Sequence, residues 1–268
     1  LLTPRDYLST FLKIGTIVAL AIGILIVSPA LQMPAVTHFI DGSGPVFSGA
    51  LFPFLFITIA CGAVSGFHAL ISSGTTPKML ENETHVRMIG YGGMLMESFV
   101  AIMALAAAAS LDPGVYFAMN SPAALIGTDA NTAAEVITTK LQFPVDAATL
   151  LHTAKEVGEN TILSRAGGAP TLAVGMAHIM SRLIPGEAMM AFWYHFALLF
   201  EALFILTAVD AGTRVARFMI QDLGSIFYKP FGNTDSIPAN LIATFFAVAL
   251  WGYFLYTGVT DPLGGINS

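Results

Sequence analysis

The sequence has few charged residues and a single cysteine for its length. Charged residues make up 10% of its 268 residues, whereas hydrophobic residues make up 55%. So little charge cannot cover the surface of a soluble protein of this size, and the mean hydropathy of +0.74 agrees. The lone Cys61 excludes an intrachain disulfide and any metal site built on thiolate spacing. A lipid bilayer is therefore expected to cover much of the chain.

Motifs for nucleotide, zinc and hydrolase chemistry are also missing. The sequence contains no Walker loop, dinucleotide fingerprint, His-Glu-x-x-His motif or Gly-x-Ser-x-Gly elbow. His152, Glu156 and Glu159 have helical spacing for a metal, but they lie in a polar stretch that predicts a solvated face. The net charge of −6 includes no Lys/Arg cluster, which argues against nucleic acid as a partner. We therefore expect that the protein is not an enzyme and that it binds neither a cofactor nor a metal ion.

Apolar runs of bilayer length recur along the chain. A helix needs about 20 mainly apolar residues to cross the hydrocarbon. The runs that qualify are Phe11–Leu31, Val46–Ile71, Ile89–Leu111, Ala188–Val209 and Leu241–Val259. They predict an all-α, polytopic transmembrane bundle, with three helices in residues 1–111 and two in residues 187–268. Lys13 falls near the start of the first run, where its amine can reach the interface.

Three segments between these runs do not fit a simple span. Residues 112–165 are too polar for lipid and predict an extramembrane helical insertion. Residues 166–186 begin with a Gly/Pro-rich stretch and are short, so they predict a re-entrant or a spanning helix. The placement of Lys and Arg favours the re-entrant form. Residues 214–229 mix basic and apolar side chains and predict an interfacial amphipathic helix between the last two spans.

A stretch dense in Gly, Ser and Thr, residues 62–78, lies at the end of the second run. A helix of this composition can break, and unwound backbone inside a bundle coordinates ions or substrate carboxylates. The alternative is helix packing, because Gly62 and Gly66 stand four residues apart. His68 and the hydroxyl residues after it favour binding. The candidate substrate-binding residues are Gly62, Ser65, Gly66, His68, Ser72, Ser73, Thr75 and Thr76.

Three acidic residues are candidates for proton coupling. Glu97 and Glu201 fall inside apolar runs, and Asp210 falls at the end of one. An ionised carboxylate at bilayer depth is costly, so it must be paired, protonated or water-facing, and a desolvated carboxyl can exchange protons near neutral pH. Alternatives are a structural acid bonded to a neighbouring helix, and for Asp210 a pair with Arg214 four residues on.

Two histidines in the second half of the chain are weaker candidates for proton relay. His178 stands four residues before Arg182, and His195 follows Trp193 and Tyr194. A single histidine on an apolar helix is more often a hydrogen-bonded core residue than a relay. We therefore assign neither of them a functional role from the sequence.

Three blocks of the chain resemble the carbon starvation protein A (CstA) family: ACGAVSGFHALISSGTTPK at 60–78, RMIGYGGMLME at 87–97 and VDAGTR at 209–214. The resemblance covers most of the chain. It implies a middle fragment of a multi-pass inner-membrane protein whose remaining transmembrane helices complete the fold. It also implies the architecture of the amino acid/polyamine/organocation superfamily, with broken helices and inverted repeats. The family is associated with uptake of peptides, and in close relatives of pyruvate, under nutrient limitation.

Two functions follow as hypotheses. The first is a secondary active transporter in the inner membrane, which takes up small peptides or a small carboxylate such as pyruvate with protons or sodium. The absence of a nucleotide-binding motif favours coupling to an ion gradient over ATP. The second is a membrane sensor or receptor of the starvation response that does not transport, in which residues 112–165 bind a ligand.

Overall fold

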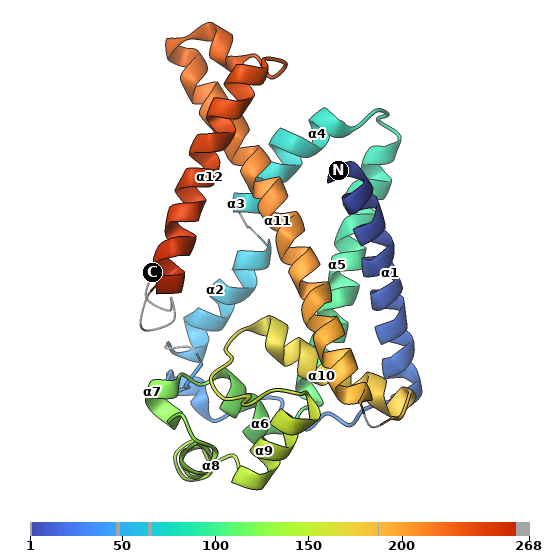
Figure 1. Ribbon diagram of the computed structural model, residues 1–268, viewed down its shortest axis with the longest axis vertical. Helices are drawn as coiled ribbons and strands as arrows, with labels where there is room; N and C mark the ends of the chain where they lie inside the picture. The colour runs from blue at the N-terminus through green and yellow to red at the C-terminus, as the bar shows by residue number, and fades with distance from the viewer. Residues whose placement is uncertain (1, 47–48, 64–65, 187, 261–268) are drawn as a thin grey trace. The chain divides into compact units, whose positions relative to one another are not determined.

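The computed structural model of the chain describes residues 2–46, 49–63, 66–186 and 188–260. Helices are the only regular secondary structure in these ranges, which confirms the all-α fold class (Figure 1). The chain divides into two compact units. The first unit consists of Leu1–Ile59 and Arg87–Phe204, and the second of Ala60–Val86 and Ile205–Ser268.

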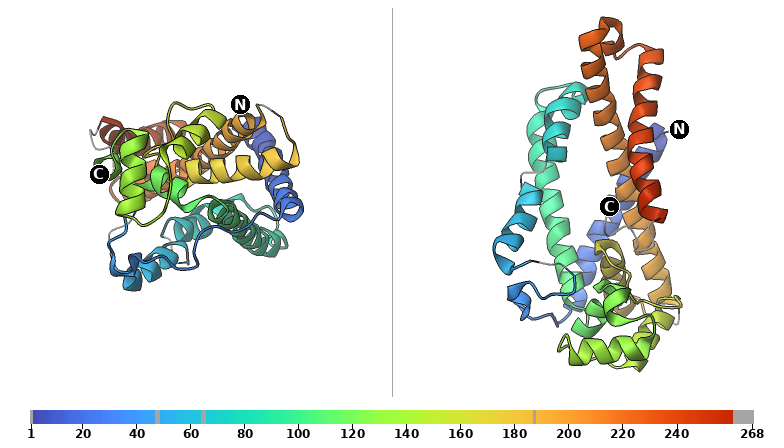
Figure 2. Two further views of the ribbon diagram at one scale, coloured as in Figure 1. Left: turned by 90° about the horizontal axis from the view of Figure 1, so that it is seen from below. Right: turned by 90° about the vertical axis from the view of Figure 1, so that its left-hand side faces the viewer.

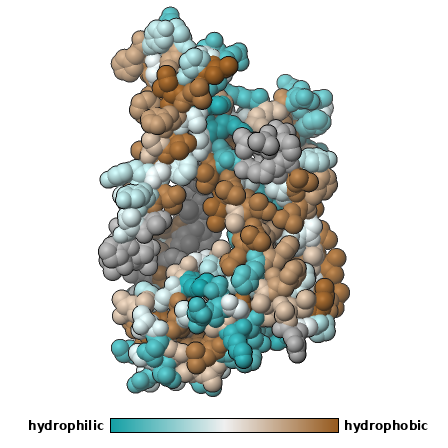
Figure 3. Space-filling model, in the orientation of Figure 1, coloured by the Kyte–Doolittle hydropathy of each residue, from teal (hydrophilic) through white to brown (hydrophobic). Residues whose placement is uncertain are grey.

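Four helices in the described ranges are long and apolar enough to cross a bilayer. They are α1 (Leu2–Val27), α5 (His85–Ala109), α11 (Met189–Phe227) and α12 (Ile237–Thr260). Hydrophobic side chains occupy much of the surface visible in Figure 3. Individual examples such as Leu25 and Met88 are 78% and 79% exposed. Apolar faces of this extent require lipid or further protein to cover them.

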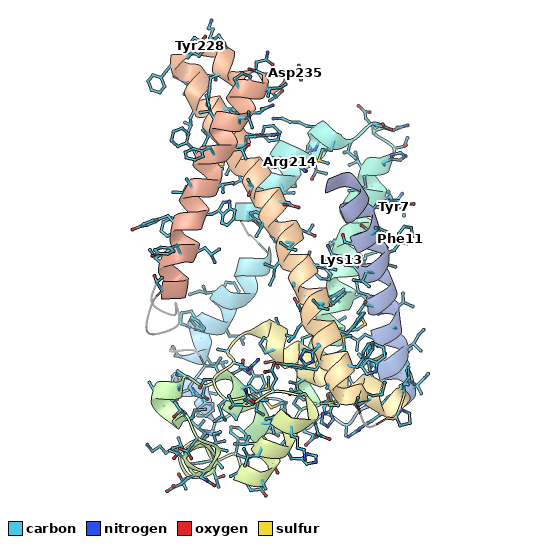
Figure 4. All side chains as sticks on the ribbon, in the orientation of Figure 1. Tyr7, Phe11, Lys13, Arg214, Tyr228 and Asp235 are labelled. Carbon is cyan, nitrogen blue, oxygen red and sulfur yellow. The ribbon has the colours of Figure 1, made fainter. Side chains whose placement is uncertain are left out.

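The first span differs from the predicted run Phe11–Leu31. Helix α1 ends at Val27, because Ser28 adopts a left-handed conformation with φ of 44° and Pro29 follows it. The candidate spanning part of α1 begins at Tyr7, where Tyr7 and Phe11 form an edge-to-face ring pair 4.9 Å apart (Figure 4). Lys13 therefore lies six residues after the start of this candidate span, farther from its end than in the predicted run.

The second predicted span, Val46–Ile71, is helical in its described parts from Leu51 onward. These parts form α2 (Leu51–Ala63) and α3 (Gly66–Leu70). A π-helix (Ile71–Thr75) and α4 (Thr76–Met79) follow. Residues 47–48 and 64–65 lie outside the described ranges. A π-helical turn marks a local change in the backbone hydrogen-bond pattern and is frequent at functional sites.

The predicted insertion is helical. It contains α6 (Pro113–Asn120), α7 (Ala123–Ile126), α8 (Ala130–Thr139) and α9 (Ala147–Glu156). The carboxylates of Asp112, Asp129 and Asp146 accept backbone N–H bonds at the starts of α6, α8 and α9. Ile126, Ile137 and other apolar side chains fill a core between these helices, so the insertion has a packed interior of its own.

Helix α10 (Gly168–Leu183) packs against the ends of α1 and α5 in the first unit (Figure 1). Its residues from Thr171 to Ala177 are all buried. The amide of Asn120 donates to the Thr171 hydroxyl over 3.0 Å and its oxygen accepts from the backbone N–H of Gly167. These bonds tie the start of α10 to α6 and thereby to the insertion.

In the second unit, α12 turns back along the C-terminal part of α11 (Figure 2, right panel, orange and red). A short 3-10 helix (Lys229–Gly232) lies in the connection. The side-chain amide of Gln221 donates to Asn240 over 2.8 Å, and the Asn240 amide donates to the carbonyl of Thr234. On α12, Ala239, Ala243 and Ala247 are buried at four-residue spacing, which is the small-residue pattern of close helix contact.

The separate amphipathic helix predicted at residues 214–229 is absent, because Arg214–Phe227 continues α11 without a break. No proline occurs between Met189 and Phe227 to stop the helix. At 1.5 Å per residue, its 39 residues extend about 58 Å, which exceeds the roughly 30 Å of bilayer hydrocarbon. Part of α11 must therefore extend beyond the hydrocarbon or tilt strongly within it.

The contact between α10 and α5 gives a stability prediction for Gly175. A Cβ atom at this position would lie 2.5 Å from the carbonyl oxygen of Ala107, so the two backbones must separate to admit a methyl group. We expect Gly175→Ala to destabilise the protein by about 1–3 kcal/mol, seen as a lower thermal midpoint of the full-length protein in detergent. Gly15→Ala is the control, because no atom of the described residues lies within 4 Å of its Cβ position. Equal midpoints for the two variants would contradict this packing.

Candidate functional site

The predicted substrate-binding residues lie on a series of short helical pieces. Gly62 lies in α2, while Ser65 lies outside the described residues. Gly66 and His68 lie in α3, Ser72, Ser73 and Thr75 in the π-helix, and Thr76 in α4. From Gly66 to Met79 the backbone is helical with a π-turn at Ile71–Thr75, so this part frees fewer backbone groups than a loop would offer. A break at residues 64–65 would lie outside the described residues.

This interrupted helix packs along α11 within the second unit. A methyl group on Gly212 would meet the ring of Phe67 at 3.2 Å. Arg214 donates from Nη1 to the Met79 sulfur over 3.4 Å (Figure 4 labels Arg214), and the Lys78 amine lies 4.4 Å from the ring centre of Phe218. The structure thus brings two predicted segments together, the Gly/Ser/Thr stretch and the stretch of α11 that follows Asp210.

The hydroxyl groups of this segment differ in their surroundings. Those of Ser72 and Ser73 are exposed and both donate to the carbonyl of Ala69, at 3.0 and 2.7 Å. Thr75 is only 4% exposed, and its hydroxyl has no hydrogen-bond partner among the residues that the structure describes. A buried hydroxyl without a partner is unfavourable. We therefore expect a ligand or a further helix to supply the hydrogen bond that the Thr75 hydroxyl lacks.

The three candidate acids are distributed over both units. Glu97 and Glu201 belong to the first unit and Asp210 to the second. Glu97 is exposed in the middle of α5, one turn after Met94, which is 51% exposed. Glu201 and Asp210 are both half-buried on α11. A carboxylate surrounded by apolar surface, such as that of Glu97, cannot face lipid without a large cost.

Lys13 is a candidate that the sequence interpretation missed. Its amine lies 4.9 Å from the ring centre of Phe204, which is on α11 one turn after Glu201. This contact turns the lysine toward α11. The available signal was the sequence ahead of the apolar run, because Pro4 is typical of the first turn of a helix and indicates that the helix begins well before Phe11. A lysine inside a span is as noteworthy as an acid.

The two histidines have different environments. The Nδ1–H of His195 donates to the carbonyl of Ala191 over 2.8 Å, a bond within its own helix that gives it a structural explanation. The Nδ1 atom of His178 is buried and has no hydrogen-bond partner within the described ranges. His152 pairs with Glu156 at 3.2 Å on an exposed face of α9. No cluster of three potential metal ligands occurs among the described residues.

Four of the described helices are long enough to cross a bilayer, have apolar outer faces and contain a few ionisable residues. These features define a multi-span helical membrane protein. The chain belongs to the carbon starvation protein CstA family, whose model, "Carbon starvation protein CstA", matches residues 1–268. "Peptide transporter CstA" of Escherichia coli (strain K12) is 66% identical to it, over 100% of this chain and 39% of the relative. "Peptide transporter CstA" of Campylobacter jejuni is 62% identical, over 99% of this chain and 38% of the relative.

A relative with a different name is also similar. "Pyruvate/proton symporter BtsT" of Escherichia coli (strain K12) is 57% identical, over 100% of this chain and 40% of the relative. The chain spans about two fifths of the length of the curated relatives it matches. No solved structure matches the chain.

Proposed function

We propose that the full-length protein is a secondary active transporter of the inner membrane that takes up small peptides or pyruvate together with protons. The observation that carries the proposal is the interrupted helix, whose residues from Phe67 to Lys78 pack along α11 just beyond Asp210. The names of relatives at 57–66% identity, a peptide transporter and a pyruvate/proton symporter, support it.

The interrupted helix is proposed to hold the substrate. Transporters bind substrates where a helix is discontinuous, because the backbone groups released there face a protein cavity instead of lipid. The hydroxyl of Thr75 is the best-defined candidate ligand, since it is buried and lacks a partner in the described part of the chain. The other proposed ligands are Gly62, Ser65, Gly66, His68, Ser72, Ser73 and Thr76.

Glu97, Glu201 and Asp210 are proposed to carry the protons. Each combines a carboxyl group with a place on a helix long enough to span the membrane. A carboxyl group can neutralise itself by binding a proton when it faces a dry environment and release the proton when water reaches it. A sodium ion would instead need several oxygen ligands at once. Coupling to protons and coupling to sodium can therefore be distinguished by experiment.

For proton coupling, we expect Glu97→Gln to reduce uptake driven by a pH gradient at least about tenfold, because glutamine keeps the shape of the side chain and cannot release a proton. The measurement is uptake of labelled pyruvate and dialanine into proteoliposomes containing the full-length protein, with a pH or a sodium gradient. Glu135→Gln, on the exposed face of α8, is the control. Wild-type gradient-driven uptake by Glu97→Gln would remove Glu97 from the coupling mechanism.

For substrate binding, Thr75→Val keeps the branched shape of the side chain and removes the hydroxyl. Because this hydroxyl has no partner to lose among the described residues, we expect the thermal midpoint to stay the same or rise. If the hydroxyl binds substrate, the KM for uptake should rise about fivefold or more, and Thr75→Ser should restore it. Normal uptake kinetics together with a lower midpoint would indicate a purely structural role.

Helix α10 is proposed to be re-entrant. Its 16 residues extend about 24 Å, less than the roughly 30 Å of bilayer hydrocarbon. The insertion contacts the start of the following span in the first unit, because Arg165 donates to the Tyr194 hydroxyl in the first turns of α11. The insertion itself begins at Asp112, directly after α5, which ends at Ala109. A path that leaves and returns on one side agrees with both features.

The topology prediction concerns two exposed positions that flank α10, Lys140 and Pro185. We expect single cysteines at these positions, in a Cys61→Ala background, to react with a membrane-impermeant thiol reagent from the same side of the membrane. Labelling of intact cells and of inverted vesicles makes the comparison. Reaction from opposite sides would show that the segment between them crosses the bilayer.

A further inference from the structure

A small pocket in the first unit combines polar side chains from three parts of the chain. Its volume is about 130 Å³, and it lies between the segment after α1, the end of α5 and α10. Four polar residues line it: Gln32, Ser110, His178 and Arg182. None of them belongs to the proposed substrate-binding or proton-coupling residues.

The walls of this pocket are held in place by hydrogen bonds of the protein itself. The backbone N–H groups of Gln32 and Met33 donate to the carbonyl of Ala109 over 2.7 and 3.1 Å. The Gln32 amide donates to the carbonyl of Ser110 over 3.0 Å. These bonds attach the segment after α1 to the end of α5. The opposite wall is fixed because α10 packs closely on α1 at Gly23.

Helix α10 presents hydrogen-bond donors to the pocket. Burial lowers the pKa of the His178 imidazole, and the charge of Arg182 lowers it further against the opposing effect of Glu156. The ring is therefore neutral near pH 7. Because its Nδ1 atom is buried without a partner, and a buried N–H without a partner is costly, the proton belongs on Nε2.

Arg182 supplies the charge. It stands one turn after His178 and is exposed, and its guanidinium makes no ion pair or hydrogen bond with any residue in the described ranges. A guanidinium presents a planar fork of donors that matches the two oxygens of a carboxylate. The pocket thus offers a cation and a neutral N–H donor side by side, and no acidic side chain among the described residues lines it.

We propose that this pocket binds the carboxylate of a small organic acid of about the size of pyruvate. The Arg182 guanidinium holds the carboxylate, and Nε2–H of His178 donates to one of its oxygens or to an adjacent carbonyl oxygen. A cavity of roughly 150 Å³ accommodates benzene, which has six heavy atoms. Pyruvate also has six, whereas the smallest dipeptide has nine, so the volume of the pocket favours the free acid over a peptide C-terminus.

This inference goes beyond the proposed function, because it adds a carboxylate site apart from the proposed substrate site, and binding to it can be measured without transport. The experiment is equilibrium binding of labelled pyruvate to the full-length protein in detergent, without any gradient. We expect Arg182→Gln to weaken binding at least about tenfold and His178→Asn about threefold or more. Arg182→Lys, which keeps the charge but loses the fork, should fall between wild type and Arg182→Gln.

Lys140→Gln is the matched control, because it removes one positive charge from an exposed position of the insertion. Competition with dialanine, with dialanine amide and with inorganic phosphate identifies the ligand chemistry. Displacement of pyruvate by other small monocarboxylates, but weakly by these three compounds, supports the proposal. Displacement by dialanine but not by its amide would assign the pocket to peptide C-termini, and equal displacement by phosphate would reduce it to a general anion site. Either result overturns the proposal.

Measurements of uptake on the same variants separate this proposal from the proposed function. If Arg182→Gln binds pyruvate with wild-type affinity, the proposal of a carboxylate site in the pocket is overturned. Normal transport by that variant leaves the proposed function intact. The opposite outcome is also possible. Pyruvate binding that depends on Arg182 supports the binding pocket. If the wild-type protein then transports neither pyruvate nor peptides under any gradient, the proposed transport function is overturned. Thermal midpoints near the wild-type value show that the variants are folded.

Discussion

The constraint on which the rest of this structure depends is that hydrocarbon cannot solvate polar groups. Continuous helices satisfy their own backbone, so α1, α5, α11 and α12 can present apolar faces to lipid. The π-turn at Ile71–Thr75 keeps its backbone hydrogen-bonded, but it carries the hydroxyl groups of Ser72, Ser73 and Thr75, which hydrocarbon cannot solvate. The packing of Phe67 on Gly212 and of Lys78 on Phe218 places part of this segment against α11 within the second unit. A polar interruption and a helix that covers it therefore belong together.

The same constraint explains which features could be predicted from the sequence. Apolar runs identify spans because length and hydropathy are local properties, and the acids Glu97 and Glu201 are conspicuous inside them. The end of α1 was misplaced because hydropathy continues through Pro29 to Leu31, whereas the helix stops where Ser28 takes a left-handed conformation. The continuation of α11 was missed because charged residues were taken as a boundary, although no residue there breaks a helix.

Features that depend on tertiary contact could not be predicted. The burial of the Thr75 hydroxyl follows from its neighbours in space and not from the composition of residues 62–78. Similarly, the i,i+4 spacing of His178 and Arg182 is visible in the sequence, but the pocket requires Gln32 and Ser110 from two other segments. The signal for Lys13 was present in the sequence, because Pro4 indicates a helix that begins several residues before Phe11 and so places Lys13 farther from its start.

The exposed carboxyl of Glu97 requires a contact that the described residues of the chain do not provide. Its neighbours on α5 are apolar and exposed, so this face would place an acid against lipid if nothing else covered it. The curated relatives are about two and a half times as long as this chain, and further helices of such a protein can supply the cover. A helix that covers this face must bring a polar group or water to Glu97, because apolar side chains alone would leave its carboxyl unsolvated. The exposed acid thus sets a requirement on whatever packs against this face of α5.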